Sequence, residues 1–142
     1  MSASLIAAMF FTVALLVTTA YFIMGSIPLL VLKHDTPLDA RFVRAFFNLY
    51  YRAAFLTAVA TAISFAAAGR PGIAAGAAAL AALAVVLRRQ VIPKMDALGA
   101  RIQSATDYVT AIPGFRKTHV TAILINIGQL AIIVWTLIAF SK

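Results

Sequence analysis

Four long apolar segments, separated by short polar or turn-forming stretches, dominate the pattern of the chain. A helix needs about 20 mainly apolar residues to cross the hydrocarbon layer of a bilayer, and each segment reaches that length. The pattern therefore predicts an all-α, integral membrane four-helix bundle that forms a single transmembrane domain over residues 1–142. The expected helices cover about residues 5–32, 42–68, 73–92 and 119–140.

The connection between the third and fourth segments has a different pattern. Apolar residues recur there at spacings of three and four, which is typical of an amphipathic helix. We expect such a helix over about residues 94–112, bounded by Pro93 and by Pro113 with Gly114. It could lie on the cytoplasmic surface, extend the third helix or dock on a partner, and the first two arrangements are favoured. Its apolar positions are Met95, Leu98, Ile102, Ala105, Val109 and Ile112.

The composition supports a membrane environment. The chain is 63% hydrophobic and 11% charged, whereas soluble domains average about 45–50% and about 25%. A soluble chain of this length could not bury so much apolar surface. Cysteine is absent, which excludes disulfides, thiolate metal sites and cysteine nucleophiles.

The positive charges predict how the helices are oriented. Lys and Arg concentrate in the loops that follow the first and third helices, with ten such residues there against two, Arg70 and Lys142, on the other side. Because cytoplasmic loops carry the excess of Lys and Arg, both termini should be periplasmic in a bacterial inner membrane. The net charge of +8 then indicates contact with anionic head groups on the cytoplasmic side rather than with nucleic acid.

Polar side chains at membrane depth are costly and need a reason. On the second helix and on the fourth, such residues share one face at helical spacing. One interpretation is structural, with interhelical hydrogen bonds on the fourth helix and an interfacial belt on the second. The other is a polar cavity that opens to the cytoplasmic side and binds a ligand. The candidate ligand-binding residues are Asn48, Tyr51, Arg52, His119, Asn126 and Gln129.

Few residues could carry chemistry. His119 is the candidate catalytic residue, as a proton acceptor with an ordinary pKa near 6.5. The chain contains two histidines and no glutamate, which makes a metal site a poor prediction. A haem held axially by His34 and His119 is a less favoured alternative, because turn formation already explains the polar residues around His34. The cofactor therefore stays unknown.

The third helix contains small residues at every fourth position, namely Ala74, Ala78 and Ala82. In lipid, small residues at this spacing let helix backbones approach one another closely. They predict a helix-packing face, which could serve self-association or contact with other membrane proteins.

Four short motifs give the chain a family resemblance. They are MGSIPLLVL at the end of the first helix, FFNLYYRAAF in the second, RRQVIPKMD after the third and FRKTHVTAILINIG at the start of the fourth. The chain resembles the anthrone-oxygenase-like group of small four-helix membrane proteins, most of which are uncharacterised. The resemblance implies that His119, Asn48, Tyr51 and Arg52 match polar positions of that group, whose founding activity is oxidation of a polycyclic aromatic.

Two functions from different classes follow. The favoured one is a non-catalytic accessory or structural subunit of a larger inner-membrane assembly. The alternative is a membrane-embedded oxygenase-like or redox enzyme, or a binder, for a hydrophobic aromatic or quinone-like ligand. In that alternative Tyr51, Arg52, His119 and Asn126 orient the polar edge of the ligand, since a few convergent polar groups suffice in an apolar pocket.

Overall fold

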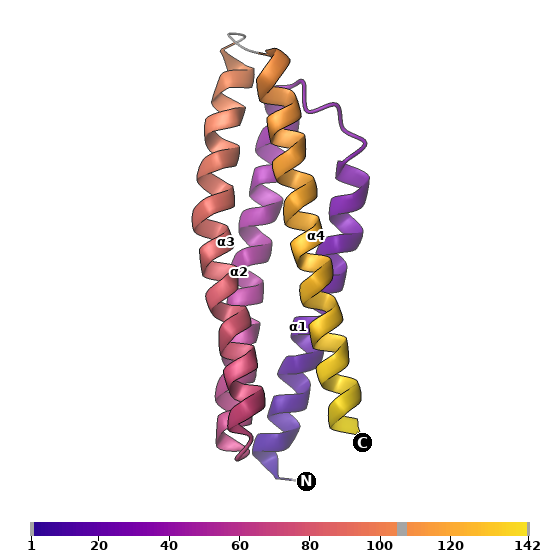
Figure 1. Cartoon of the computed structure of the whole chain (residues 1–142), viewed down its shortest axis with the longest axis vertical. Coiled ribbons are helices and arrows are strands. Elements are labelled where there is room, and N and C mark those ends of the chain that lie inside the picture. The colour runs from indigo at the N-terminus through magenta and orange to yellow at the C-terminus, as the bar shows by residue number, and fades with distance from the viewer. Residues whose placement is uncertain (1, 105–107, 142) are drawn as a thin grey trace.

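The computed structural model describes residues 2–104 and 108–141 and contains four long helices in this part of the chain. They are α1 (Ala3–Leu29), α2 (Pro37–Ala67), α3 (Pro71–Gln103) and α4 (Tyr108–Ser141). All four are long and apolar enough to cross a membrane, as predicted. Successive helices run in opposite directions, so both ends of the chain lie at the same end of the bundle (Figure 1).

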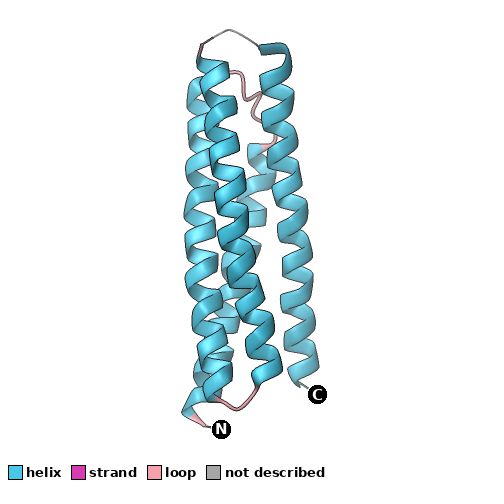
Figure 2. Cartoon of the chain, turned by 60° about the vertical axis from the view of Figure 1, so that its left-hand side comes forward, coloured by secondary structure: helices cyan, strands magenta, loops and turns pink. Residues whose placement is uncertain are grey.

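The helices form a ring in which α1 packs on α2, α2 on α3, α3 on α4 and α4 on α1. Figure 2 shows the four axes running nearly side by side, as in an up-and-down bundle. The turn between α2 and α3 is tight, and Gly69 takes a positive φ of 70° there, a conformation that glycine adopts without steric cost. The loop between α1 and α2 covers residues 30–36 and closes the opposite end of the bundle.

Helix α2 begins five residues earlier than its apolar pattern predicts. Thr36 is its N-cap, because its hydroxyl accepts a hydrogen bond from the backbone N–H of Asp39 at 3.2 Å. Pro37 occupies the first helical position, where its missing N–H costs nothing. A cap and a proline therefore set the start of the helix, rather than the first apolar residue.

The predicted amphipathic helix over residues 94–112 is not present as a separate element. Residues 94–103 continue α3 through Pro93, residues 108–112 begin α4, and residues 105–107 lie outside the described part of the chain. The periodicity has another cause. Met95 and Ile102 are buried in the main core, so their apolar face packs against neighbouring helices rather than against a membrane surface.

The size of the buried side chains differs between the two ends of the bundle. Large residues fill the end that holds the α1–α2 loop, among them Phe22, Phe47, Tyr51, Met95 and Phe115. Towards the termini, the clusters contain mostly alanine, such as Ala8, Ala58, Ala74 and Ala81. The half of the bundle near the termini therefore has less side-chain volume with which to fill the space between helices.

Candidate functional site

Five polar residues in the core each have at least one buried side-chain nitrogen or oxygen atom that makes no side-chain hydrogen bond. Buried polar groups are normally paired, so each exception calls for an explanation. The five come from α1, from the loop that follows it, from α2 and from α4. They are Ser26, His34, Tyr51, His119 and Asn126.

His34 and His119 come together at the closed end of the bundle. Their ring centroids lie 5.6 Å apart with the planes at 85°, and both residues are 0% exposed. Phe115 packs beside His34 and Phe47 beside His119, at centroid distances of 5.4 and 5.1 Å. Neither ring makes a side-chain hydrogen bond, and the nearest polar groups are the backbone of Leu32 for His34 and that of Ser26 for His119.

The loop holds His34 in an unusual backbone conformation. Its φ of 57° is the only positive value at a non-glycine residue in the described chain. Desolvation by burial lowers the pKa of His34 from 6.5. Asp39, the backbone of Leu32 and Asp35 raise this pKa, whereas the charge of Arg116 lowers it further. Burial therefore favours the neutral form of His34 over the charged form.

A second polar group connects α2 with α4 deeper in the bundle. The hydroxyl of Tyr50 donates to Oε1 of Gln129 at 3.2 Å, and both side chains are buried. The ring of Tyr50 also stacks on Phe22 at 3.9 Å. Gln129 thus makes an interhelical hydrogen bond, whereas Asn126, one turn earlier on α4, makes none with either side-chain atom.

Two of the sequence-predicted residues lie away from this core. Asn48 accepts a hydrogen bond from Nε of Arg88 at 2.9 Å and so connects α2 with α3 on an exposed face. Arg52 is exposed. The structure therefore brings Tyr51, His119, Asn126 and Gln129 into the interior but places Arg52 outside it.

The alanines of α3 face different ways. Ala74 is buried against α1 and α2, whereas Ala78 and Ala82 are exposed. Within the chain, the packing face of α3 uses Ala77, Ala81 and Ala84 instead. A packing role for Ala78 and Ala82 stays a prediction, and it would involve a second chain.

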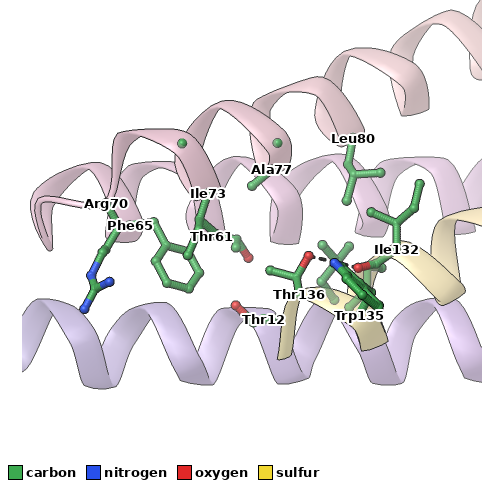
Figure 3. Close-up of a pocket in the computed structure, with 14 residues that line it drawn as sticks. Thr12, Thr61, Phe65, Arg70, Ile73, Ala77, Leu80, Ile132, Trp135 and Thr136 are labelled. Carbon is green, nitrogen blue, oxygen red and sulfur yellow. Dashed lines mark hydrogen bonds between the residues drawn. The ribbon is translucent and has the colours of Figure 1, made fainter. Parts of the chain in front are cut away.

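A cavity of about 640 Å³ opens in the half of the bundle near the termini. All four helices line it, and apolar side chains such as Leu15, Ile73 and Ile133 form most of its wall. Figure 3 shows Arg70 at one end of the cavity and Trp135 towards the other. The small residues of α3 account for this space, because a Cβ added at Gly76 would meet no atom within 4 Å.

A narrow recess lies next to the cavity, deeper in the core. Leu15, Leu80 and Ile133 line both spaces. The recess measures about 10 Å³, which is close to the smallest volume that holds one water molecule. Its polar lining is Thr19, Tyr50, Tyr51 and Gln129. Hydrogen-bonding groups therefore lie next to the inner end of the cavity.

Sequence reasoning missed the cavity residues Arg70 and Trp135. No single residue marks a cavity, but the stretch from Gly72 to Ala82, which is alanine and glycine except for Ile73 and Leu80, was an available signal. Sequence reasoning also explained His34 as part of a turn, because its backbone lies in a polar loop. The direction of its side chain depends on the positive φ, which the sequence did not indicate.

Comparison of the chain with models of protein families, with curated proteins and with solved structures gave no match. The function must therefore be argued from the site itself.

Proposed function

We propose that the chain is a membrane protein that binds a hydrophobic small molecule of the aromatic or quinone-like class in the cavity near its termini. The supporting observation is an apolar cavity of about 640 Å³ that shares three lining residues with a recess lined by two tyrosines and a glutamine. Ligand pockets are typically about 300–1,000 Å³, with an apolar wall and a few convergent polar groups.

The inner end of the cavity favours a ligand with a hydrogen-bond acceptor. The hydroxyl of Tyr51 is buried and has no partner, and this residue lines the recess. A carbonyl oxygen that reaches the recess would accept a hydrogen bond from this hydroxyl and remove the cost of leaving it unpaired. Quinones combine such a carbonyl with an apolar body, which is why we favour that class.

The binding test uses the only tryptophan of the chain, Trp135, which lines the cavity. In lipid nanodiscs, a short-chain quinone should quench its fluorescence with a saturable component. Gly76→Phe should abolish that component, because the new ring enters the cavity at a position with free space. Ala75→Phe is the matched control, since Ala75 is exposed on the same turn and does not line the cavity.

Loss of saturable quenching in Gly76→Phe alone supports the proposal. Equal quenching in both variants and in the unmodified chain would contradict it, because a quinone that is dissolved in the lipid and not bound in the cavity would quench all three equally. An alkane of similar length, which has no carbonyl, should not compete. Competition by the alkane would show that a hydrogen bond from Tyr51 is not needed for binding.

A second function, an accessory subunit of a larger membrane assembly, has its own supporting observation. The outer face of α3 carries only small side chains at Ala75, Ala78, Ala79 and Ala82, all of them exposed. In lipid, such a face lets another helix approach closely. This face lies apart from the cavity, so one protein could have both functions.

The subunit proposal is tested by extracting the chain from native membranes in mild detergent. The double variant Ala78→Leu/Ala82→Leu should lose its co-purifying proteins, because the leucines keep a partner helix at a distance. Gly76→Phe should retain them. Complexes that survive the double variant unchanged would rule out α3 as the contact face.

A further inference from the structure

The cavity proposed as the ligand site has one charged residue in its lining. Among the described residues that line it, only Arg70 is charged, and this residue lies in the turn between α2 and α3. Figure 3 shows the Arg70 side chain at the end of the cavity next to that turn, which we call the turn end. A quinone with an apolar body and carbonyl groups offers nothing charged to a guanidinium. Arg70 therefore points to a further feature of the ligand.

The threonines of the cavity wall do not compete with Arg70 as hydrogen-bond donors. The hydroxyls of Thr12, Thr61 and Thr136 each donate to a backbone carbonyl one turn earlier, at 2.7, 2.8 and 2.9 Å. Because a hydroxyl has a single hydrogen, these three groups can only accept hydrogen bonds from a ligand. The guanidinium of Arg70, by contrast, has five N–H donors and no acceptor. Hydrogen bonding at the turn end therefore selects a ligand group that accepts.

The charge around the turn end also favours an anion. The chain contains no glutamate. The described aspartates lie in the α1–α2 loop, in the first turn of α2 and in the last third of α3, all towards the opposite end of the bundle, and they are Asp35, Asp39 and Asp96. No acidic side chain of the described residues would therefore repel an anion that is bound at the turn end.

The cavity offers Arg70 a binding partner other than a lipid head group. Arginines near the ends of spanning helices often extend to head groups, but Arg70 lines the cavity. The cavity volume of about 640 Å³ is typical of pockets for drug-sized molecules, whereas a phospholipid has two long acyl chains. The five N–H donors of a guanidinium also let it bind a ligand in addition to its contacts within the protein.

We propose that Arg70 binds a carboxylate at the turn end of the cavity, so that the ligand is an amphipathic acid with an apolar body. This inference rests on the proposed function, because it specifies the chemical class of the molecule that the same cavity binds. A carboxylate matches a guanidinium in shape, since the two planar groups form two parallel N–H···O hydrogen bonds. Its charge also makes these hydrogen bonds stronger than those to a neutral acceptor.

The carboxylate and the carbonyl of the ligand would lie at opposite ends of its apolar body. Leu80 lines both the cavity and the recess, and Figure 3 shows Leu80 and Arg70 towards opposite ends of the cavity. Tyr51 lines the recess. A carboxylate held by Arg70 therefore directs the other end of the molecule towards the recess, and the ligand is bound in one orientation.

The test compares two short-chain quinones that differ only at the end of the side chain, where one has a carboxylate and the other a carboxamide. Their dissociation constants for the full-length chain in phosphatidylcholine nanodiscs are measured by quenching of Trp135, which lines the cavity. The variants are Arg70→Gln and Arg70→Lys. Arg89→Gln is the matched control, because Arg89 is exposed on α3 and does not line the cavity. Partitioning into lipid is the same for every variant, so it cancels when the ratio of the two constants is compared between them.

We expect the wild type to bind the carboxylate about 10-fold more tightly than the carboxamide, the size of effect that a hydrogen bond to a charged group has. Arg70→Gln should lose this preference and bind the carboxamide as the wild type does, which shows that the cavity is intact. Arg70→Lys should keep part of the preference, because an ammonium retains the charge but not the two-point geometry. Arg89→Gln should behave as the wild type. Added salt should reduce the preference by screening.

Three results would overturn the proposal. The first is an equal ratio of the two dissociation constants in the wild type and in Arg70→Gln. The second is loss of both quinones in Arg70→Gln, which would give Arg70 a structural role. The third is displacement of the carboxylate quinone by phosphatidylglycerol added to the nanodiscs, which would assign Arg70 to a lipid head group. The proposed function fails in a different way, namely if Gly76→Phe binds both quinones as the wild type does.

Discussion

Thr12 and Thr19 on α1 are buried polar residues whose hydroxyls donate to backbone carbonyls one turn earlier, at 2.7 and 2.9 Å. Gln129 is likewise satisfied by Tyr50. These side chains meet the requirement that polar groups in lipid find internal partners. The buried side chain of Asn126 does not meet it, because neither of its polar atoms has a partner. Unsatisfied polar groups in a well-packed core are typical of functional positions, which sacrifice stability.

Asn126 and Gln129 provide a test of this distinction within one helix. Gln129→Leu should lower the free energy of unfolding by about 0.6–1.7 kcal/mol, the range of interhelical hydrogen bonds in a membrane protein. Asn126→Leu should leave the free energy of unfolding unchanged or raise it, because it removes an unpaired buried amide. Unfolding in mixed micelles, followed by circular dichroism, measures both.

The control is Tyr50→Phe, which removes the other half of the same hydrogen bond and should lower stability by a similar amount. In the double variant Tyr50→Phe/Gln129→Leu, the two losses should not add. A large loss of stability in Asn126→Leu would show that this amide stabilises the fold. Asn126 would then no longer be a candidate ligand-binding residue.

At the scale of helices, the four spans could be predicted because each needs only length and apolar composition. Their ends could not. Pro93 and Pro113 indicated helix boundaries, yet both lie inside helices. Tertiary packing outweighs the local preference of proline here. Met95 and Ile102 are buried beyond Pro93, and a two-point ion pair connects the extended α3 with α2.

That ion pair joins Arg44 to Asp96, with Nε–Oδ1 and Nη2–Oδ2 distances of 2.8 and 3.0 Å. Both side chains are substantially exposed, so its contribution is that of a surface pair, about 0–1 kcal/mol. Its partners lie on different helices, and hydropathy patterns carry no information about such pairs. The Arg44–Asp96 pair therefore could not be predicted from the sequence.

The candidate site was predictable to the extent that it follows helix periodicity. His119, Asn126 and Gln129 were expected to share an inward face, and all three are buried. The cavity and the meeting of His34 with His119 depend on how far apart the helices lie and on one loop φ. Neither the distance between the helices nor the φ of a loop residue produces a periodic pattern in the sequence.

At the scale of the whole molecule, the two ends of the bundle differ. The end with the α1–α2 loop is closed by large side chains and carries most of the positive charge, whereas the end with both termini is open at the cavity. We propose that the charged end is cytoplasmic, following the positive-inside rule. The cavity would then open in the outer half of a bacterial inner membrane.

This orientation can be measured directly, because the chain contains no cysteine. A single cysteine introduced at Ser2 should react in intact cells with a thiol reagent that cannot cross the inner membrane. One introduced at Lys33 should react only after the cells are lysed. The reverse pattern would place the cavity on the cytoplasmic side.

The central claim, that the cavity binds a hydrophobic molecule, is tested most directly by native mass spectrometry of the chain released from native membranes. We predict one small-molecule adduct per chain, present in Ala75→Phe and absent in Gly76→Phe. The mass of the adduct would also give the identity of the ligand. A bare chain, or an adduct found equally in both variants, would contradict the claim.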